Sequence, residues 1–215
     1  MERDWDPEIL EQIKNFERWH TAITIPINVD LKASPKIINI DQAASYLDNA
    51  ENIYLSDCIC RTMMQNCESP RRTCIAWDSA KPLLDTEVYK NQNTVEITRE
   101  EAIETLRMSN EAGLFHMAYA MWDDEVNRLC GCCSTCCAVF SAVLRHKMYP
   151  DLITSDTISV TDMEKCVNDG TCVERCHFRA REITNGKLKV NDELCYGCGL
   201  CVSTCPSEAI SLVEK

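Results

Sequence analysis

The sequence predicts an α+β fold in two domains: a mostly helical, cysteine-rich domain over residues 1–155, and a smaller domain of short strands and helices over residues 156–215. In the first domain, apolar residues recur at helical spacing behind N-capping residues. In the second, a segment repeats with an offset of 29 residues. Between the two, Pro150 and a Thr/Ser-rich stretch up to Thr157 are typical of a domain boundary.

The first domain is expected to begin with a short amphipathic helix. Asp6-Pro7-Glu8 is a helix start, because proline suits the first turn, and Ile9, Ile13 and Phe16 follow at helical spacing. The stretch from Thr21 to Ile40 is rich in Ile, Val and Pro but has no helical period. It therefore predicts extended chain or short strands.

A second helix is expected after Asp41, which can cap it, and the segment Ile53-Tyr54-Leu55 then predicts a buried strand. A third helix is predicted more strongly. Thr98-Arg-Glu-Glu101 has the pattern of a capping box, Leu106 lies on the apolar side, and Gly113 is a typical stop.

Nine cysteines fall in the first domain, and their spacing fits the paired Cys-x2-Cys motifs of zinc ribbons and knuckles poorly. Iron–sulfur ligation is therefore favoured, in one or two clusters, with zinc binding and reduced structural thiols as the alternatives. Nine ligands would serve two ordinary cubanes with one thiol to spare, or one larger cluster. The candidate ligands are Cys58, Cys60, Cys67, Cys74, Cys130, Cys132, Cys133, Cys136 and Cys137.

The last of these cysteines precede an apolar helix predicted through Val139 and Leu144. Cys133, Cys136 and Cys137 then fall at positions i, i+3 and i+4 of a helix start. This spacing predicts that all three thiolates point to one side, where the first-turn amides stabilise their charge.

In the second domain, the segment from Cys195 to Pro206 has the pattern Cys-x2-Cys-x2-Cys-x3-Cys-Pro, the ligand run of bacterial iron–sulfur ferredoxins. When the sequence is shifted by 29 positions, an upstream run aligns with this segment, and the alignment extends to the flanking strands. Each half is therefore predicted to contain a strand, a cluster loop, a short helix and a second strand. The aligned pairs are Cys166 with Cys195, Cys172 with Cys201, and Cys176 with Cys205, while Asp169 falls on Cys198 and His177 falls on Pro206.

Residues 156–215 therefore resemble a bacterial-type two-cluster ferredoxin, with the (βαβ)2 fold of that family and one ligand exchanged. The resemblance implies crossed ligation, in which the last cysteine of each run binds the other cluster. Cluster A then takes Cys176, Cys195, Cys198 and Cys201, and cluster B takes Cys166, Cys172 and Cys205, with Asp169 opposite its fourth iron.

A carboxylate is a harder ligand than a thiolate and holds cluster iron more weakly. The corner at Asp169 is therefore expected to be Asp-ligated, open to water or a small ligand, or lost to leave a 3Fe-4S cluster. In the alternative interpretation, Asp169 is a solvated loop residue beside a 3Fe-4S cluster. The sequence does not choose between these two.

Three other polar residues near cysteines each have two interpretations. His177 either tunes a cluster through a hydrogen bond to sulfur or is an ordinary surface residue, which is favoured. His116 is a ligand or proton carrier, or a packing or capping residue, and the second is again favoured. Arg61 can donate to cluster sulfide or to its own loop.

From about Gln42 to its end, the chain is similar to a broad set of uncharacterised 4Fe-4S binding proteins from anaerobes. The shared frame is Cys-x-Cys-Arg, two more cysteines, the segment Glu111 to His116, a Cys-x-Cys-Cys-x2-Cys-Cys group and a terminal ferredoxin. The resemblance implies one organised protein with every cysteine group metal-loaded, and it implies no substrate.

The formal net charge of −12 makes nucleic acid an unsuitable partner and favours docking to a basic patch on a redox protein, although acidity can also serve solubility alone. Sixteen cysteines behind an N-terminus without a signal-peptide pattern predict metal binding in a reducing cytoplasm. The longest nearly apolar run, from Ala138 to Leu144, is too short to span a bilayer.

These observations predict a multi-cluster electron-transfer protein that passes single electrons from a low-potential donor to a redox enzyme or a larger complex. The sequence has no Gly-x-Gly-x-x-Gly and no phosphate-binding Gly-Lys-Ser/Thr run, so a carrier is favoured over an enzyme. Two alternatives stay open. One is an activation or assembly factor for another metalloenzyme, and the other is a reductase with catalysis at an N-terminal cluster or at the Asp169 corner.

Overall fold

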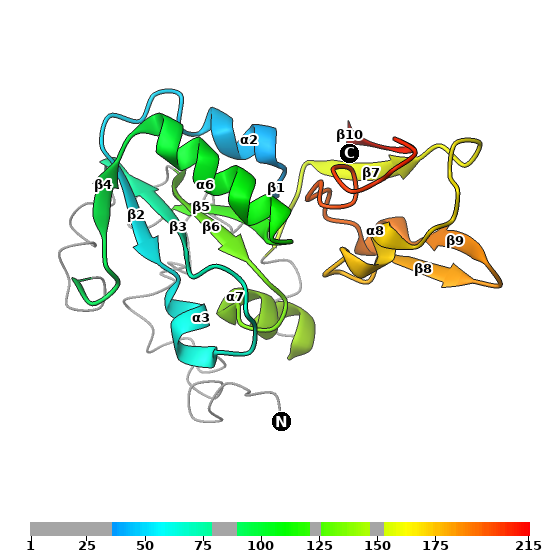
Figure 1. Cartoon of the computed structure of the whole chain (residues 1–215), viewed down its shortest axis with the longest axis horizontal. Coiled ribbons are helices and arrows are strands. Elements are labelled where there is room, and N and C mark those ends of the chain that lie inside the picture. The colour runs from blue at the N-terminus through cyan, green and yellow to red at the C-terminus, as the bar shows by residue number, and fades with distance from the viewer. Residues whose placement is uncertain (1–35, 79–89, 121–125, 147–152) are drawn as a thin grey trace, which may run out of the picture.

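The computed structural model describes residues 36–78, 90–120, 126–146 and 153–215 (Figure 1). The helix predicted from Asp6 to Phe16 and most of the extended stretch before Ile40 lie outside the described residues. The domain boundary near residue 155 stays a prediction.

A six-stranded antiparallel sheet organises the described residues before position 147, with the strand order β1-β5-β6-β3-β2-β4. A mostly helical first domain is not confirmed, because only short helices and one longer helix accompany this sheet. The strands are β1 (Lys36–Ile38), β2 (Ile53–Asp57), β3 (Arg72–Trp77), β4 (Val95–Ile97), β5 (Phe115–Ala120) and β6 (Val126–Cys132).

Cysteines and aliphatic residues occupy opposite faces of this sheet, because successive side chains of a strand point to opposite sides. Ile75 and Leu129 are paired in register and belong to a buried cluster with residues of α2 (Ile40–Ser45) and α6 (Arg99–Glu111). Cys74 and Cys130, one position away on the same strands, are also paired and lie on the other face. In β3 and β6, cysteine alternates with aliphatic residues, so polar residues do not recur at every second position. The sequence analysis therefore did not predict these two strands.

The two helices on the aliphatic face begin with capping boxes. Thr98 and Glu101 exchange the predicted hydrogen bonds at the start of α6, and that helix ends just before Gly113, whose φ is +82°. The cap predicted at Asp41 is wrong. Asn39 caps α2 instead and forms the box with Gln42, because the helix begins two residues earlier than expected.

Two short helical segments follow strands on the cysteine side of the sheet. The helix α3 (Ile59–Met64) comes directly after β2, and its N-cap is Cys58. The helix α7 (Ala138–Phe140) continues into η3 (Ser141–Arg145), and its N-cap is Cys137.

The C-terminal part shows the predicted internal repeat in its hydrogen bonds. Val173 N donates to Gly170 O at 2.8 Å, and the equivalent Val202 N donates to Gly199 O at 2.9 Å. Both glycines have positive φ, a conformation that glycine adopts without strain. The elements are β7 (Thr157–Thr161), α8 (Thr171–Glu174), β8 (Arg181–Thr184), β9 (Lys187–Val190), η5 (Asp192–Leu194) and β10 (Ile210–Glu214).

The strands of the two halves pair symmetrically, with β7 against β10 and β8 against β9, both antiparallel. In Figure 1 these four strands lie beside the end of the six-stranded sheet that faces the C-terminal end of α6. The two parts of the chain also share a buried core, which is described below with the cysteines that it connects.

Candidate metal centres

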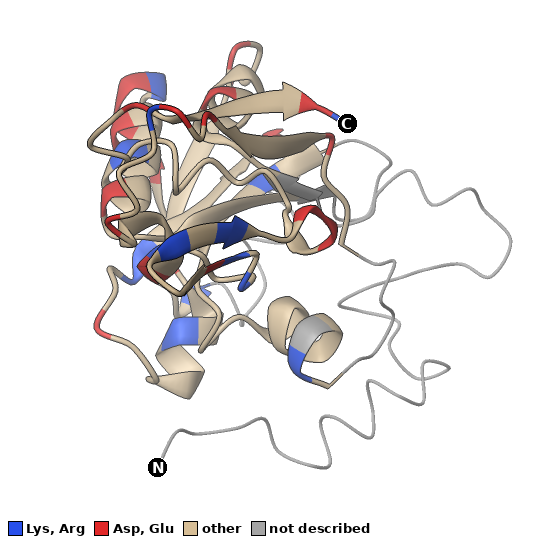
Figure 2. Cartoon of the chain, turned by 90° about the vertical axis from the view of Figure 1, so that its right-hand side faces the viewer, with Lys and Arg blue, Asp and Glu red and all other residues tan. Residues whose placement is uncertain are grey.

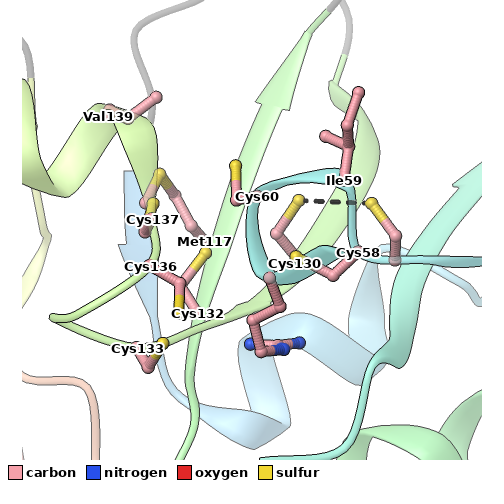
Figure 3. A pocket seen from close by; sticks show the side chains of 12 residues that line it. Cys58, Ile59, Cys60, Met117, Cys130, Cys132, Cys133, Cys136, Cys137 and Val139 are labelled. Atoms are coloured by element: carbon pink, nitrogen blue, oxygen red, sulfur yellow. Dashed lines mark hydrogen bonds between the residues drawn. The ribbon is translucent and has the colours of Figure 1, made fainter. Parts of the chain in front are cut away.

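Eight of the nine N-terminal cysteines line one pocket on the cysteine face of the sheet, around a cavity of about 60 Å³ (Figure 3). Strand pairing brings Cys74 and Cys130 together, with their Sγ atoms 3.6 Å apart. Residues far apart in the sequence are thereby collected at one place. The cysteines of the pocket are Cys58, Cys60, Cys74, Cys130, Cys132, Cys133, Cys136 and Cys137.

Six of these thiols interact with one another at close range and are called the six-thiol group: Cys58, Cys60, Cys74, Cys130, Cys132 and Cys137. A hydrogen bond with Cys60 lowers the pKa of Cys58 to about 7. The reciprocal bond, together with burial, raises the pKa of Cys60 well above its usual value. Crowded buried thiolates repel one another, so this arrangement suits a bound cation that would neutralise them.

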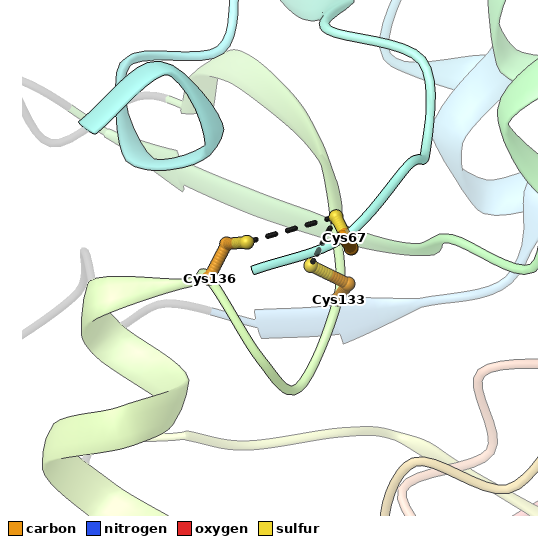
Figure 4. Close-up of side chains that lie close together, drawn as sticks. All are labelled: Cys67, Cys133 and Cys136. Carbon is orange, nitrogen blue, oxygen red and sulfur yellow. Dashed lines mark hydrogen bonds between the residues drawn. The ribbon is translucent and has the colours of Figure 1, made fainter. Parts of the chain in front are cut away.

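The remaining three N-terminal cysteines, Cys67, Cys133 and Cys136, are called the three-thiol group (Figure 4). Their sulfur atoms all lie within 4.8 Å of one another. Cys67 comes from the loop after α3, whereas the other two lie in the turn before α7.

The prediction that Cys133, Cys136 and Cys137 occupy the start of a helix is wrong, although all three line the same pocket. The helix begins only at Ala138, and the three cysteines precede it in a turn. Cys136 approaches Cys67, while Cys137 interacts with the thiols of Cys60 and Cys132. The turn therefore divides these cysteines between the two groups.

Two buried arginines face the N-terminal thiols. Arg61 is 2% exposed, and it donates from Nη1 to Gly131 O at 2.8 Å and from Nη2 to Thr73 Oγ1. Although burial alone lowers the pKa of Arg61, the fields of nearby thiols, among them Cys133, raise it. Arg128 lies two residues before Cys130 on β6 and points to the same face, a role that the sequence analysis missed.

His116 is a packing residue, as favoured from the sequence. It is fully buried on β5 in register with Ile38 and Gly131, so its side chain lies on the face of the sheet opposite Cys130. Burial lowers the pKa of His116 to about 4, so the ring is neutral at physiological pH.

In the C-terminal part, the four cysteines assigned to cluster A come together. Burial raises the pKa of Cys198 to about 12, and the fields of Cys201, Cys176 and Cys195 act in the same direction. Cys176 belongs to the first half of the repeat and the other three to the second, as crossed ligation requires. Backbone amides already point at these sulfurs, with Ser159 N 3.4 Å from Cys195 Sγ and Ala180 N 3.3 Å from Cys176 Sγ.

The residues assigned to cluster B also lie near one another. Burial raises the pKa of Cys172, and the fields of Asp169 and Cys166 add to this rise. The field of Asp169 also reaches Cys205, whose pKa is nevertheless lowered because hydrogen bonds outweigh the effect of burial. Asp169 is exposed, and its carboxylate accepts a hydrogen bond from Thr171 Oγ1.

Arg181 lies between the two C-terminal cysteine sets and was missed from the sequence. Its side chain is 3% exposed, with Nη2 donating to Ser159 Oγ at 2.8 Å and Nη1 to Thr161 Oγ1 at 3.0 Å. Although burial alone lowers the pKa of Arg181, the fields of Cys201 and Cys172 raise it. One buried guanidinium thus faces thiols of both sets. Only the fold reveals this contact, because nothing in the local sequence indicates that an arginine at the start of a strand will face cysteines.

The interpretation of His177 as an ordinary surface residue is wrong, because its ring is half-buried between the two parts of the chain. The ring packs edge-on against Phe115, and Nε2 lies 2.7 Å from Gly113 O. Since a carbonyl only accepts, Nε2 carries the proton, and Nδ1 accepts from Ser134 Oγ at 3.1 Å while the ring is neutral. Burial lowers the pKa of His177, which favours this neutral form.

An aromatic core continues from this histidine and joins the two parts. The rings of Phe115, Phe140 and Phe178 pack with centroids 5.2 to 5.4 Å apart. The same buried cluster contains Cys132 of the six-thiol group and Cys198 of cluster A. N-terminal and C-terminal candidate ligands therefore contact one shared core.

Comparison with known proteins agrees with the C-terminal cysteine geometry. Residues 188–211 match the family described as 4Fe-4S binding domain. The chain carries a ferredoxin-type 4Fe-4S domain there. This domain contains Cys195, Cys198, Cys201 and Cys205, so 4Fe-4S binding is supported for the chain.

Three curated relatives are similar to parts of the chain. Hydrogenase-4 component A of Escherichia coli is 31% identical over 87 residues, which cover 38% of this chain and 42% of the relative. Pyruvate synthase subunit PorD of Methanocaldococcus jannaschii is 37% identical over 57 residues, or 26% of this chain and 66% of the relative. A ferredoxin of Pyrobaculum islandicum is 40% identical over 57 residues, or 26% and 53%. The chain thus spans less than two thirds of each relative.

These similarities support an electron-carrier role of the ferredoxin type. In the part of the chain that the structure describes, no helix has the length and apolar character needed to cross a bilayer.

Proposed function

We propose that this protein is a multi-cluster electron carrier that passes single electrons from a low-potential donor to a redox enzyme partner, through centres in both parts of the chain. The observation that carries the proposal is the shared aromatic core, which contacts Cys132 and Cys137 on one side and Cys198 on the other. Electron transfer is faster through short, closely packed routes than through solvent, so such a core suits a relay.

The proposed ligands follow the groups in the structure. Cluster A takes Cys176, Cys195, Cys198 and Cys201, and cluster B takes Cys166, Cys172 and Cys205 with Asp169 at its fourth corner. At least one further iron–sulfur cluster is proposed at the six-thiol group, whose six cysteines, four buried and two half-buried, border one cavity. We keep the proposed domains at residues 1–155 and 156–215.

Cluster A is proposed as the link between the two parts. Phe178 packs against both Phe115 and Phe140, and the ring of Tyr196 packs on it at a tilt, with centroids 4.9 Å apart. Cys176 lies two residues before Phe178 and packs against the same core. The ligands of cluster B do not belong to this core, so cluster B is proposed as the outer end of the relay.

The partner is proposed to be a redox enzyme or a larger oxidoreductase complex. Two of the relatives are named as components of enzymes, a hydrogenase and a pyruvate synthase. Acidic residues lie over both parts of this chain (Figure 2), which suits a partner with a basic docking surface.

Replacing Phe178 with alanine tests the relay. The change removes a ring that is 7% exposed, so we expect the free energy of unfolding to fall by about 3–5 kcal/mol. Electron transfer between the N-terminal and C-terminal centres is expected to slow severalfold, because the packed route is interrupted. Rapid-freeze electron paramagnetic resonance, in which each reduced cluster is followed separately after mixing with a donor, measures this rate.

Ile183→Ala is the matched control, because this apolar side chain is 40% exposed on β8 and lies outside the shared core. It should leave the rate unchanged. If Phe178→Ala, with full iron and sulfide content, transfers electrons as fast as the wild type, the aromatic core is not the route.

The rate of electron transfer to a basic partner protein is expected to fall as ionic strength rises through the physiological range. The screening length shortens from about 10 Å at 0.1 M salt to about 3 Å at 1 M, so the attraction of a net charge of −12 is lost. Stopped-flow mixing at increasing salt measures the second-order rate constant. A rate constant that does not change with salt concentration would instead indicate that the protein is a permanent subunit, bound to its partner through an apolar interface.

A further inference from the structure

Two members of the three-thiol group, Cys133 and Cys136, line the same pocket as the six-thiol group. The six-thiol group contains a close pair, Cys74 and Cys130, with Sγ atoms 3.6 Å apart, whereas all three sulfur atoms of the three-thiol group lie within 4.8 Å of one another. The Sγ atom of Cys67 lies 3.7 Å from that of Cys133 and 3.6 Å from that of Cys136 (Figure 4). Among the described residues, this is the one set of three or more Cys, His, Asp or Glu side chains whose ligand atoms all lie within 4.8 Å of one another.

Three sulfur atoms that all lie this close to one another suit one metal ion rather than a cluster. Thiolates that share a tetrahedral ion with metal–sulfur bonds of about 2.3 Å stand about 3.8 Å apart. In a cubane, each cysteine binds a different iron, so the cysteine sulfurs stand further apart than this. A single ion would therefore enter the group with little rearrangement.

The surroundings are those of a built site. Thr135 Oγ1 lies 3.5 Å from Cys133 Sγ and 3.7 Å from Cys136 Sγ, and Asn66 Nδ2 donates to Thr135 O at 3.2 Å. The two loops that supply the ligands are thus tied together. Hydrogen bonds to sulfur of this kind stabilise metal-bound thiolates and hold them in place.

Burial differs among the three thiols. Cys133 and Cys136 are buried, at 4% and 0% exposed, whereas Cys67 is only half-buried. The group therefore has a closed apolar side at Met64 and Leu114 and an accessible side at Cys67.

We propose that Cys67, Cys133 and Cys136 form a mononuclear site for a thiophilic divalent ion, zinc or ferrous iron, separate from the iron–sulfur cluster of the six-thiol group. Three protein ligands leave the fourth tetrahedral position to an exogenous ligand, as in catalytic rather than structural zinc sites. Both ions are borderline in softness and accept oxygen as well as sulfur donors, so a water molecule or a small thiol is the class of ligand that the open position takes.

The test compares two cysteine variants of the full-length chain, purified without oxygen, for iron, zinc and acid-labile sulfide per chain. Cys67→Ser is expected to lose one metal ion with sulfide unchanged. Cys74→Ser, a change of the same kind in the six-thiol group, should instead lose iron and sulfide together. Cys136→Ser provides a second measurement if Cys67→Ser does not fold.

Three outcomes of the counting experiment are decisive. If Cys67→Ser loses several irons together with sulfide, the three thiols belong to a cluster and the proposal is wrong. If it loses no metal, they are structural thiols and the proposal is again wrong. If the wild type contains no sulfide, the proposed electron-carrier function fails, yet the loss of one ion in Cys67→Ser would still support the mononuclear site.

The open position is tested by replacing the ion with Co²⁺, whose visible spectrum reports its ligands. In the wild type, 2-mercaptoethanol is expected to shift the absorption bands of the Co²⁺ site in a saturable manner, and Cys67→Ser should lack the original bands. Bands that do not respond to thiol or to pH would show a fourth protein ligand and overturn the proposal of an exchangeable position.

Discussion

Replacing Asp169 with cysteine is expected to add one iron per chain and to remove a three-iron signal from the electron paramagnetic resonance spectrum of the oxidised protein. Asp169 stands where the 29-residue repeat has Cys198 in the other half. It is exposed, and its field reaches Cys172 and Cys205 of the same proposed cluster. A thiolate holds cluster iron more tightly than a carboxylate, so the fourth iron should stay in place.

Two further variants make this result specific. Thr171→Val removes the hydrogen bond to the Asp169 carboxylate without adding a ligand, so the three-iron signal should remain. Cys198→Asp should transfer the labile iron to cluster A. If Asp169→Cys changes neither the iron content nor the spectrum, residue 169 does not face the cluster.

Replacing Arg181 with leucine is expected to lower the reduction potentials of both C-terminal clusters by an amount on the order of 100 mV. A unit charge about 4 Å from another is worth roughly 4 kcal/mol at an effective dielectric constant of about 20, and the charge of a cluster is spread over several atoms. Reduction adds negative charge, which the buried guanidinium stabilises. Its loss therefore favours the oxidised state, and protein-film voltammetry measures both potentials.

The same variant should lower the free energy of unfolding by about 3–5 kcal/mol, because removal of one partner leaves buried charge uncompensated. Arg181→Lys keeps the charge and should recover much of the potential, although it cannot reproduce the paired bonds to Ser159 and Thr161. Lys189→Leu removes an exposed charge on β9 and should change neither potential measurably. Unchanged potentials in Arg181→Leu would show that the guanidinium does not act on the clusters.

Local spacing predicted the elements whose causes are local. The capping box of α6 and its end before Gly113 depend on residues within one or two turns, and the structure shows both. The strand predicted at Ile53-Tyr54-Leu55 is also present, as the first part of β2. In contrast, the strands β3 and β6 were not predicted, because cysteine alternating with aliphatic residues gives no polar period to mark them.

By itself, the sequence determined that the chain carries a ferredoxin-type 4Fe-4S motif, because the four cysteines from Cys195 to Cys205 belong to one continuous segment whose spacing specifies its use. Only the tertiary structure decided how the N-terminal cysteines divide. Strand pairing joins Cys74 to Cys130, whereas a turn sends Cys133 and Cys136 toward Cys67. The burial of Arg181 between the two C-terminal cysteine sets also follows only from the tertiary structure. Contacts between distant segments depend on register and packing, and the local spacing of residues does not encode them.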